Sequence, residues 1–336
     1  ARGQSSSDGW VFATSPFTDL WFHGMALVDP VGPGPSPLYD PGYPSAIQRA
    51  KEAAGAGGTA LDTSLGMFRN AFRSDPAFQV LHFLPLYFPQ AGRTEVLSAL
   101  ALLAGTGEGI PRAPSARTSF GIAAIGSVLT TPGQRRVLGE FVMSLEEEWK
   151  GFYEGHVRQT SEARTALEGQ VNQIWRSAYA SALDPFLERV GMSGGAVHLV
   201  TALGQEGRVF GGSPQAANDN VLAVSASAGE EANGVVFSML RELAFPMVRE
   251  VMRDIGLEGA DPATEERLAG VAAVRAAALV IQRYRPEDDG ALHRFFLDSA
   301  GTPAPAEGDL ESLFQESFPL PQNLFEALRD EVFSSL

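Results

Sequence analysis

Apolar side chains recur every three or four residues along much of this chain, and this spacing places them on one face of a helix. Val137, Phe141, Leu145 and Trp149 follow one another at intervals of four residues and predict a helix over residues 134–152. The same spacing predicts a long helix over residues 161–190, bent or restarted at Pro185. Shorter helices are expected over residues 45–72 (broken by the glycines of 54–58), 95–104, 123–129, 311–318 and 321–333.

One stretch in the middle of the chain changes to the pattern of strands. Residues 196–203, 208–211 and 221–227 are apolar runs separated by turn-rich segments. Two long helices are predicted after them, over residues 235–255 and 261–284, the second with Asp261 as its N-terminal cap. Helices, a short set of strands and then two long helices indicate an α+β fold that is predominantly helical, with a small mixed sheet.

The first 45 residues are rich in proline, glycine and aromatic residues, and their aromatic side chains predict packing against the rest of the protein. Residues 78–88 are densely apolar and predict a buried segment or the end of a strand. We expect a Pro/Gly-rich and helical N-terminal portion over residues 1–155 and a second domain over residues 156–336, with a boundary near residues 153–160. One continuous domain is the alternative.

Composition argues against several classes of protein. The chain has 336 residues, 44% of them hydrophobic, which is enough to bury a substantial core. Its 25 basic and 40 acidic residues give a net charge of −15, which argues against nucleic acid and anionic membranes as partners. It has no cysteine, which excludes disulfides and thiolate zinc sites, and no apolar run approaches the ~20 residues of a membrane span. The polar segment after Ala1 is what a secreted or periplasmic protein shows once its signal peptide is removed, although a trimmed chain begins in the same way.

The predicted helix over residues 235–255 carries the most informative motif. Arg241-Glu242-Leu243-Ala244-Phe245 has the spacing of the zinc-binding H-E-x-x-H motif, with both histidines replaced. In that motif two imidazoles hold Zn²⁺ and the glutamate polarises the bound water. Arginine only donates hydrogen bonds and phenylalanine has no lone pair, so Arg241 and Phe245 cannot coordinate a metal. Pro246 follows at once and removes a backbone donor. We therefore expect no catalytic residue, no metal and no cofactor at this degenerate site.

From Trp175 onward, over roughly the second half of the chain, the sequence resembles the gluzincin superfamily of zinc metallopeptidases, especially its secreted bacterial domains of unknown function. The likeness lies in the order of a small sheet with an edge strand, a helix with the motif frame, and a second helix. That helix, Glu266-Arg-Leu-Ala-Gly-Val-Ala-Ala-Val-Arg275, is similar to the one that supplies a glutamate ligand. The resemblance implies a zincin-like core with two long helices, and it places Glu266 at the third-ligand position, with Glu265 in the neighbouring register.

Losing a divalent cation from between two glutamates would leave buried like charges. Arg241 is therefore predicted to replace the positive charge by pairing with Glu242 or Glu266, while Phe245 fills the vacated space. The alternative is that Arg241 and Glu242 lie on the solvated face of an ordinary amphipathic helix, whose apolar stripe consists of Val236, Leu240, Leu243, Met247 and Val251.

Other polar residues give weaker signals. No two histidines lie within four residues of each other, so the sequence has no local histidine pair for a metal. The run Glu146-Glu147-Glu148 is expected to be a solvated helix face. Neither a G-x-S-x-G elbow nor a P-loop is present, which argues against the familiar serine hydrolases and NTPases.

The resulting functional expectation is a non-catalytic pseudopeptidase that acts as an exported binding or scaffold protein for an unidentified protein or peptide. A cleft shaped for an extended peptide can hold one by strand addition without cutting it. A second hypothesis is a metal-dependent hydrolase with a non-standard site, assembled from scattered residues such as His23, His82, His156 and Glu266. A third is a structural subunit of an envelope assembly, whose contacts with another chain would bury Trp10, Trp21 and Tyr39.

Overall fold

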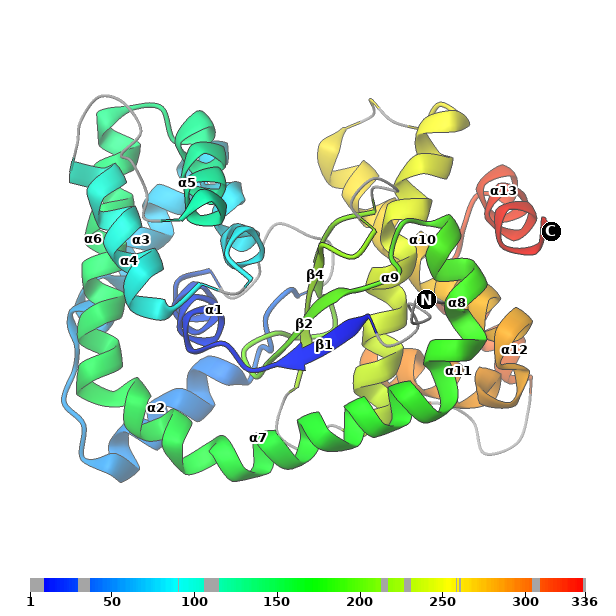
Figure 1. Cartoon of the computed structure of the whole chain (residues 1–336), viewed down its shortest axis with the longest axis horizontal. Helices are drawn as coiled ribbons and strands as arrows, with labels where there is room; N and C mark the ends of the chain where they lie inside the picture. The colour runs from blue at the N-terminus through cyan, green and yellow to red at the C-terminus, as the bar shows by residue number, and fades with distance from the viewer. Residues whose placement is uncertain are drawn as a thin grey trace, which may run out of the picture.

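Two groups of helices lie on either side of a four-stranded sheet in the computed structural model (Figure 1). The structure describes residues 9–29, 37–89, 91–105, 115–212, 217–226, 231–257, 259, 261–303 and 309–334. The N-terminal lobe consists of α1 (Pro16–Val28), α2 (Tyr43–Ala54), α3 (Ala60–Ser74), the 3₁₀ helices η2 (Pro76–His82) and η3 (Leu84–Tyr87), α4 (Arg93–Gly105), α5 (Ala116–Val128) and α6 (Pro132–Glu148). The C-terminal lobe consists of α8 (Ala180–Arg189), α9 (Ala232–Asp254), α10 (Pro262–Tyr284), the 3₁₀ helix η7 (Pro286–Asp288), α11 (Asp289–Ser299), α12 (Leu310–Ser317) and α13 (Gln322–Phe333).

A continuous helical segment joins the two lobes. From α6 the chain passes through the π-helical turn η4 (Trp149–Tyr153), α7 (Glu154–Ile174) and the π-helical turn η5 (Trp175–Tyr179) into α8 without a non-helical residue. Figure 1 shows α6 at the left, α7 along the bottom and α8 at the right, so the segment changes direction where the π turns lie. Such turns are a known cause of helix bends. The chain is therefore helical across residues 153–160, where the sequence predicts a break.

The sheet is mixed. Its order is β1 (Trp10–Ala13), β2 (Gly195–Val200), β4 (Asn220–Ser225) and β3 (Arg208–Phe210). The first three strands are parallel, and β3 runs antiparallel to β4 at the edge. Because β1 comes from the start of the chain, both predicted portions contribute to one sheet.

Each face of the sheet contributes to a different hydrophobic core. Successive side chains of a strand point to opposite faces. Leu222 and Val224 of β4 accordingly join the C-terminal core, while Val221 and Ala223 join the N-terminal core. The sheet thus separates two cores, and its central strand β4 is buried on both faces, which explains the almost unbroken apolar sequence of β4.

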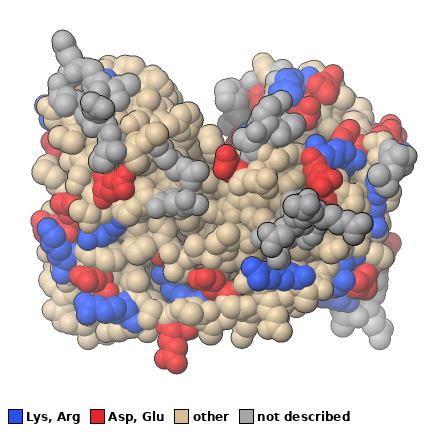
Figure 2. All heavy atoms as spheres, in the orientation of Figure 1, with Lys and Arg blue, Asp and Glu red and all other residues tan. Residues whose placement is uncertain are grey.

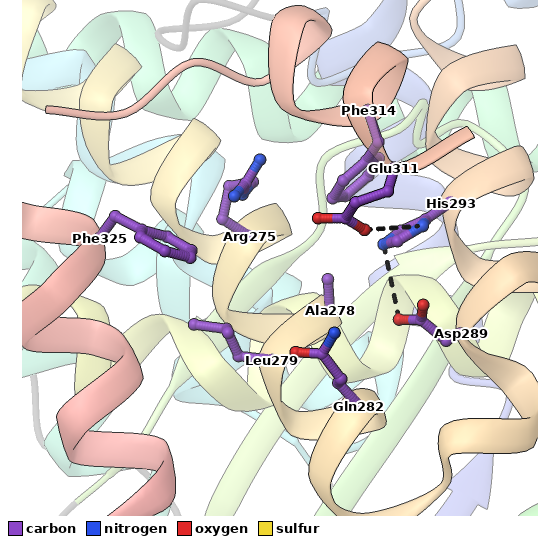
Figure 3. Close-up of a pocket in the computed structure, with 9 residues that line it drawn as sticks. All are labelled: Arg275, Ala278, Leu279, Gln282, Asp289, His293, Glu311, Phe314 and Phe325. Atoms are coloured by element: carbon purple, nitrogen blue, oxygen red, sulfur yellow. Dashed lines mark ion pairs between the residues drawn. The ribbon is translucent and has the colours of Figure 1, made fainter. Parts of the chain in front are cut away.

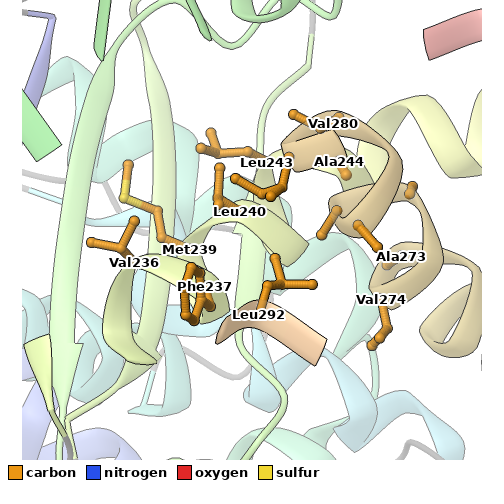
Figure 4. Close-up of a cluster of buried hydrophobic side chains, with 14 of the residues drawn as sticks. Val236, Phe237, Met239, Leu240, Leu243, Ala244, Ala273, Val274, Val280 and Leu292 are labelled. Atoms are coloured by element: carbon orange, nitrogen blue, oxygen red, sulfur yellow. The ribbon is translucent and has the colours of Figure 1, made fainter. Parts of the chain in front are cut away.

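In the C-terminal core, α9 packs along α10. Figure 4 shows Leu240, Leu243 and Ala244 of α9 turned toward the helix that carries Ala273 and Val280. Small residues recur along the buried face of α10 and allow this close packing; they are Ala269, Ala272, Ala273, Ala276 and Ala277. The predicted cap of α10 is present, because the side chain of Asp261 accepts a hydrogen bond from the Thr264 amide at 3.1 Å.

The structure bears out the predominantly helical α+β class and the small mixed sheet. The aromatic residues near the N-terminus are buried in their own chain, including Trp10, Trp21 and Tyr39, so these three are not exposed anchors for a partner. One element was not expected, because residues 16–28 form a helix. Residues 78–88 are the buried segment that was predicted as one of two alternatives, and they form 3₁₀ helices rather than the end of a strand. No described helix combines the length and apolar character that a membrane span requires.

Candidate functional site

The first four residues of the motif frame on α9, Arg241–Ala244, are buried. Arg241 is 4% exposed and Glu242 is 2% exposed, so the alternative of a solvated helix face is wrong. The guanidinium of Arg241 contacts the Glu242 carboxylate through Nη1 and lies 3.6 Å from Glu206 through Nη2. Burial opposes the charge of Arg241, but Glu242 and Glu206 outweigh it and raise its pKa. The predicted pairing of Arg241 with Glu242 is thus present, with Glu206 as an additional partner.

Glu206 and Glu242 connect α9 to the edge strand. Glu206 lies in the turn before β3, and its carboxylate is 3.5 Å from Nη1 of Arg208. Glu242 accepts a hydrogen bond from the backbone amide of Gly207 at 3.0 Å. Two arginines and two glutamates, all at most 5% exposed, therefore form a charge-balanced cluster at the start of β3. We call Glu206, Arg208, Arg241 and Glu242 the edge-strand cluster.

Gly207 is required by this close approach of helix and strand. A Cβ atom at this position would lie 2.6 Å from the backbone oxygen of Ala223 and 2.7 Å from Cγ of Glu242. Real Cβ atoms essentially never come so close to backbone oxygen, so a larger residue would push β3 away from β4 or from α9.

Glu266 and Phe245 lie apart from the edge-strand cluster. Glu266 forms an ion pair with Arg249, which also lies 2.8 Å from Glu265. The guanidinium of Arg249 stacks over the ring of Phe245, with 5.2 Å to its centroid, and Phe245 remains partly exposed. Of the two partners predicted for Arg241, only Glu242 contacts it. A cavity of about 360 Å³ borders Arg241 and Glu206, and Phe245 is not among the residues that line it.

The scattered residues of the second hypothesis do not form a common cluster. His23 bonds Tyr43 and Glu148, while His82 bonds the hydroxyl of Tyr39 at 2.7 Å. Glu266 lies on α10 in the other lobe with its partner Arg249.

Within the described residues, one group of histidine and carboxylate side chains is close enough to consider as a metal site (Figure 3). Nε2 of His293 lies 3.5 Å from Asp289, and Nδ1 lies 3.6 Å from Glu311. A metal ion bonds one imidazole nitrogen, whereas these carboxylates approach opposite nitrogens. Arg275 lines the same small pocket and adds a positive charge. The arrangement therefore holds an imidazole between two acceptors and is poorly suited to one metal ion.

The N-terminal lobe contains a larger buried polar network around Glu148. The side chain of Glu148 is fully buried, so the expectation that residues 146–148 form a solvated face is wrong for this residue. Its carboxylate lies 3.0 Å from Nε2 of His23 and 2.9 Å from Nζ of Lys51. Burial disfavours its charged form, but hydrogen bonds from His23, Thr59 and Lys51 outweigh burial and lower its pKa to about 2. Lys51 also pairs with Asp62 at 2.7 Å.

Two residues of these clusters, Glu206 and Glu148, were not expected from the sequence to be buried. Glu206 is a single acidic residue in a turn, and no local pattern marks it as buried. Glu148 does carry a signal: it follows Phe141 by seven residues and Leu145 by three, so it lies on the same helix face as these two buried side chains.

No family model, no curated protein and no solved structure matches this chain. Its function must therefore be inferred from the geometry of its own residues.

Proposed function

We propose that the chain is a pseudopeptidase: a non-catalytic protein of metallopeptidase-like design that binds an extended peptide along the edge strand β3. The edge-strand cluster carries the proposal. A guanidinium occupies the first ligand position of the motif, and its charge is balanced by Glu242 and Glu206. The glutamate that would act as general base instead accepts the amide of Gly207 and holds β3 against α9.

The order of elements supports a zincin-like origin. An antiparallel edge strand precedes α9, and α9 packs against α10, which carries Glu266. Burial lowers the pKa of Arg241, and the charge of Glu266 helps Glu242 and Glu206 to raise it, with a smaller effect than either of those two. Arg241 and Glu266 are therefore near enough to interact electrostatically without forming an ion pair.

The surface beside β3 supports peptide binding. Figure 2 shows a hollow in the surface at the top of the view. In the same orientation, Figure 1 places α5 on one side of this hollow and α9 and α10 on the other. Phe120 of α5 is 57% exposed and Phe210 of β3 is 39% exposed. The ring of Tyr87 lies between them, with centroid distances of 6.4 Å to Phe120 and 5.2 Å to Phe210. A strand edge beside exposed aromatic rings offers backbone hydrogen bonds and apolar contacts to an extended chain.

Restoring the two missing ligands tests the metallopeptidase design. We expect the wild type to retain substoichiometric zinc after incubation with Zn²⁺ and desalting, measured by elemental mass spectrometry. The double variant R241H/F245H is expected to retain about one zinc per chain, because the imidazoles then share one helix face with Glu266 nearby. Adding Glu266→Ala is expected to weaken zinc binding by about tenfold or more.

The double variant R241A/F245A is the matched control, since it removes the same side chains without adding ligands. If R241H/F245H holds no more zinc than this control, the metallopeptidase design is wrong. One tightly held zinc in the wild type would contradict the non-catalytic proposal.

Peptide capture tests the binding role separately. A displayed library of random ten-residue peptides is selected on the wild type, and the selected peptides are assayed on Phe210→Ser and Phe120→Ser. Both changes are expected to reduce affinity at least about tenfold, since each removes an apolar contact beside β3. Met143→Ser, at a position 62% exposed on α6, serves as the control and is expected to leave affinity unchanged. Failure to select any peptide, or equal loss in all three variants, would contradict the proposal.

A further inference from the structure

A pocket of about 560 Å³ lies where the parallel strands end. Thr201 follows β2 and Ala226 follows β4, and both line the pocket. In sheets with parallel strands, ligands bind outside the carboxyl ends of the strands. The volume is within the ~300–1,000 Å³ typical of small-molecule sites. The remaining walls come from α2, α7 and Asp40.

The polar end of this pocket is anchored in the interior. Arg164 of α7 is 9% exposed, and its Nη2 donates to Asp19 at 2.7 Å and to the backbone oxygen of Leu199 at 3.2 Å. Its buried Nε has no hydrogen-bond partner among the described residues. Because Nε is enclosed by protein, the donor capacity that remains for a ligand is that of Nη1, for which no hydrogen bond is found among the described residues; the guanidinium itself is fixed in position by Nη2.

Tyr43 lines the pocket beside Arg164 and connects it to the network around Glu148. The Glu148 carboxylate accepts from Nε2 of His23, and the other ring nitrogen, Nδ1, lies 2.9 Å from the Tyr43 hydroxyl. The pocket wall at Tyr43 is thus held from behind by a chain of buried hydrogen bonds.

Charge and lining indicate the kind of ligand. Arg164 is already neutralised by Asp19, and burial lowers the pKa of His156, which favours its neutral form. The wall therefore offers no uncompensated buried cation for an anionic ligand. Arg164 only donates hydrogen bonds and so cannot hold a cationic ligand, and Asp40, the carboxylate in the wall, is only half-buried and accepts from the Gly42 amide through Oδ1 at 2.8 Å. The rest of the lining is largely apolar and includes Ile47, Leu167 and Ala226.

We propose that this pocket binds a small uncharged molecule with a largely apolar body, whose carbonyl oxygen accepts a hydrogen bond from Arg164. A carbonyl matches the remaining donor capacity of the guanidinium without adding charge, and the apolar lining accommodates the body. This site does not depend on the pseudopeptidase proposal, because it shares no residue with the edge-strand cluster.

Three probes of nearly equal shape test the proposal: benzamide, benzoate and benzamidine. Their binding to the full chain at pH 7.5 is followed by saturation-transfer NMR titration. Benzamide is expected to bind with a Kd in the millimolar range, as for fragments of this size, and at least about fivefold more tightly than either charged probe. Benzoate or benzamidine binding as tightly as benzamide would overturn the assignment of an uncharged ligand, and no binding of any probe would overturn the site.

Two tryptophan variants of α7 locate the binding. Ala163 is exposed and lines the pocket, so Ala163→Trp is expected to fill it and weaken benzamide binding about tenfold or more. Thr165→Trp places the same ring at an exposed position outside the lining and is expected to bind benzamide like the wild type. Equal affinity in the two variants would overturn the proposed location.

Discussion

The two lobes bury charge in different ways. In the N-terminal lobe, Glu148 of α6 joins His23 of α1, Lys51 of α2 and, through Lys51, Asp62 of α3. The first and last of these four residues, His23 and Glu148, are 125 positions apart in the sequence. In the C-terminal lobe, Arg241 pairs with its neighbour Glu242 and with Glu206 from the adjacent turn. One network joins four separate helices, whereas the other connects one helix to the start of one strand.

The difference follows from the side chains that fill the two cores. Large rings pack against one another in the N-terminal core, where the ring centroid of Phe141 lies 5.3 Å from that of Trp21 and 5.2 Å from that of Phe68. Rings of this size leave spaces between helices that polar side chains can occupy. Small and aliphatic residues let α9 and α10 approach closely, and the buried ion pairs of Arg241 lie at the end of the core that meets β3, while Arg275 of α10 is buried against aromatic rings of α12 and α13. In both of these clusters the buried charges persist because they are paired.

Removing Glu148 is expected to have the largest effect on stability. Glu148→Ala leaves Lys51 and His23 buried without their shared acceptor, which should lower the free energy of unfolding by about 3–5 kcal/mol in urea denaturation. Glu154→Ala is the matched control, because the ion pair of Glu154 with Arg158, at 3.7 Å, is exposed and its loss should cost about 0.5 kcal/mol or less. Equal losses in the two variants would show that the buried network stabilises the protein no more than an exposed ion pair does.

Removing Arg241 is expected to have a smaller effect of the same kind. Arg241→Ala leaves Glu206 and Glu242 facing each other without a cation, but the cavity of about 360 Å³ beside them can admit water. We expect a loss of about 3 kcal/mol by urea denaturation. Adding Glu242→Gln should recover part of it, since one of the two unpaired charges is then removed. Wild-type stability of Arg241→Ala would contradict the interpretation of the edge-strand cluster as an ion-pair replacement for a metal.

The N-terminal lobe is also expected to set the response to acid. Burial lowers the pKa of His82 from 6.5 to about 3, so its contribution to stability is present above pH 6.5 and is lost as the pH falls toward 3. Asp19 changes stability in the opposite direction. Burial, partly offset by Arg164, raises its pKa to about 6, so its contribution to stability is present at low pH and is lost as the pH rises through 6. Comparing wild type with His82→Asn therefore isolates the histidine.

Between pH 7 and pH 5, the wild type is expected to lose about 2 kcal/mol more stability than His82→Asn, from the pH dependence of a single buried imidazole. The measurement is urea denaturation of both proteins at the two pH values. The same pH slope in both would show that His82 is able to protonate in the folded state.

The fold could be predicted from the sequence where its pattern is local. Amphipathic helices such as α6 and the apolar strands β2 and β4 were expected because their periodicity is contained within a few turns or residues. The helix α1 could not be recognised, because every residue from Phe17 to Val28 is buried and no polar face gives it a period. The strand β1 has only four residues, and its partner lies 185 positions later in the sequence, where Trp10 pairs with Gly195. Its own sequence therefore does not indicate a strand.

The candidate site divides in the same way. Arg241 and Glu242 could be found because the motif lies within five consecutive residues. Glu206 and Arg249 could not, because their roles depend on which segments meet in space. The pocket at the strand ends is assembled from α2, α7 and the residues after two strands, and no local spacing in the sequence marks it.

The smallest expected effect concerns the contact between α9 and β3. Gly207→Ala would place Cβ against the Ala223 oxygen and Cγ of Glu242, and relieving that overlap requires a shift of the strand or the helix. We expect a loss of about 1.5 kcal/mol in urea denaturation. The control is Gly57→Ala, whose Cβ would meet nothing within 4 Å and which should change stability by less than about 0.5 kcal/mol. Hydrogen exchange at the amide of position 207 should be faster in Gly207→Ala than in the wild type if Glu242 holds the edge strand in place. Unchanged exchange would mean that β3 is held by β4 alone, and the glutamate of the motif would then have no part in positioning the strand.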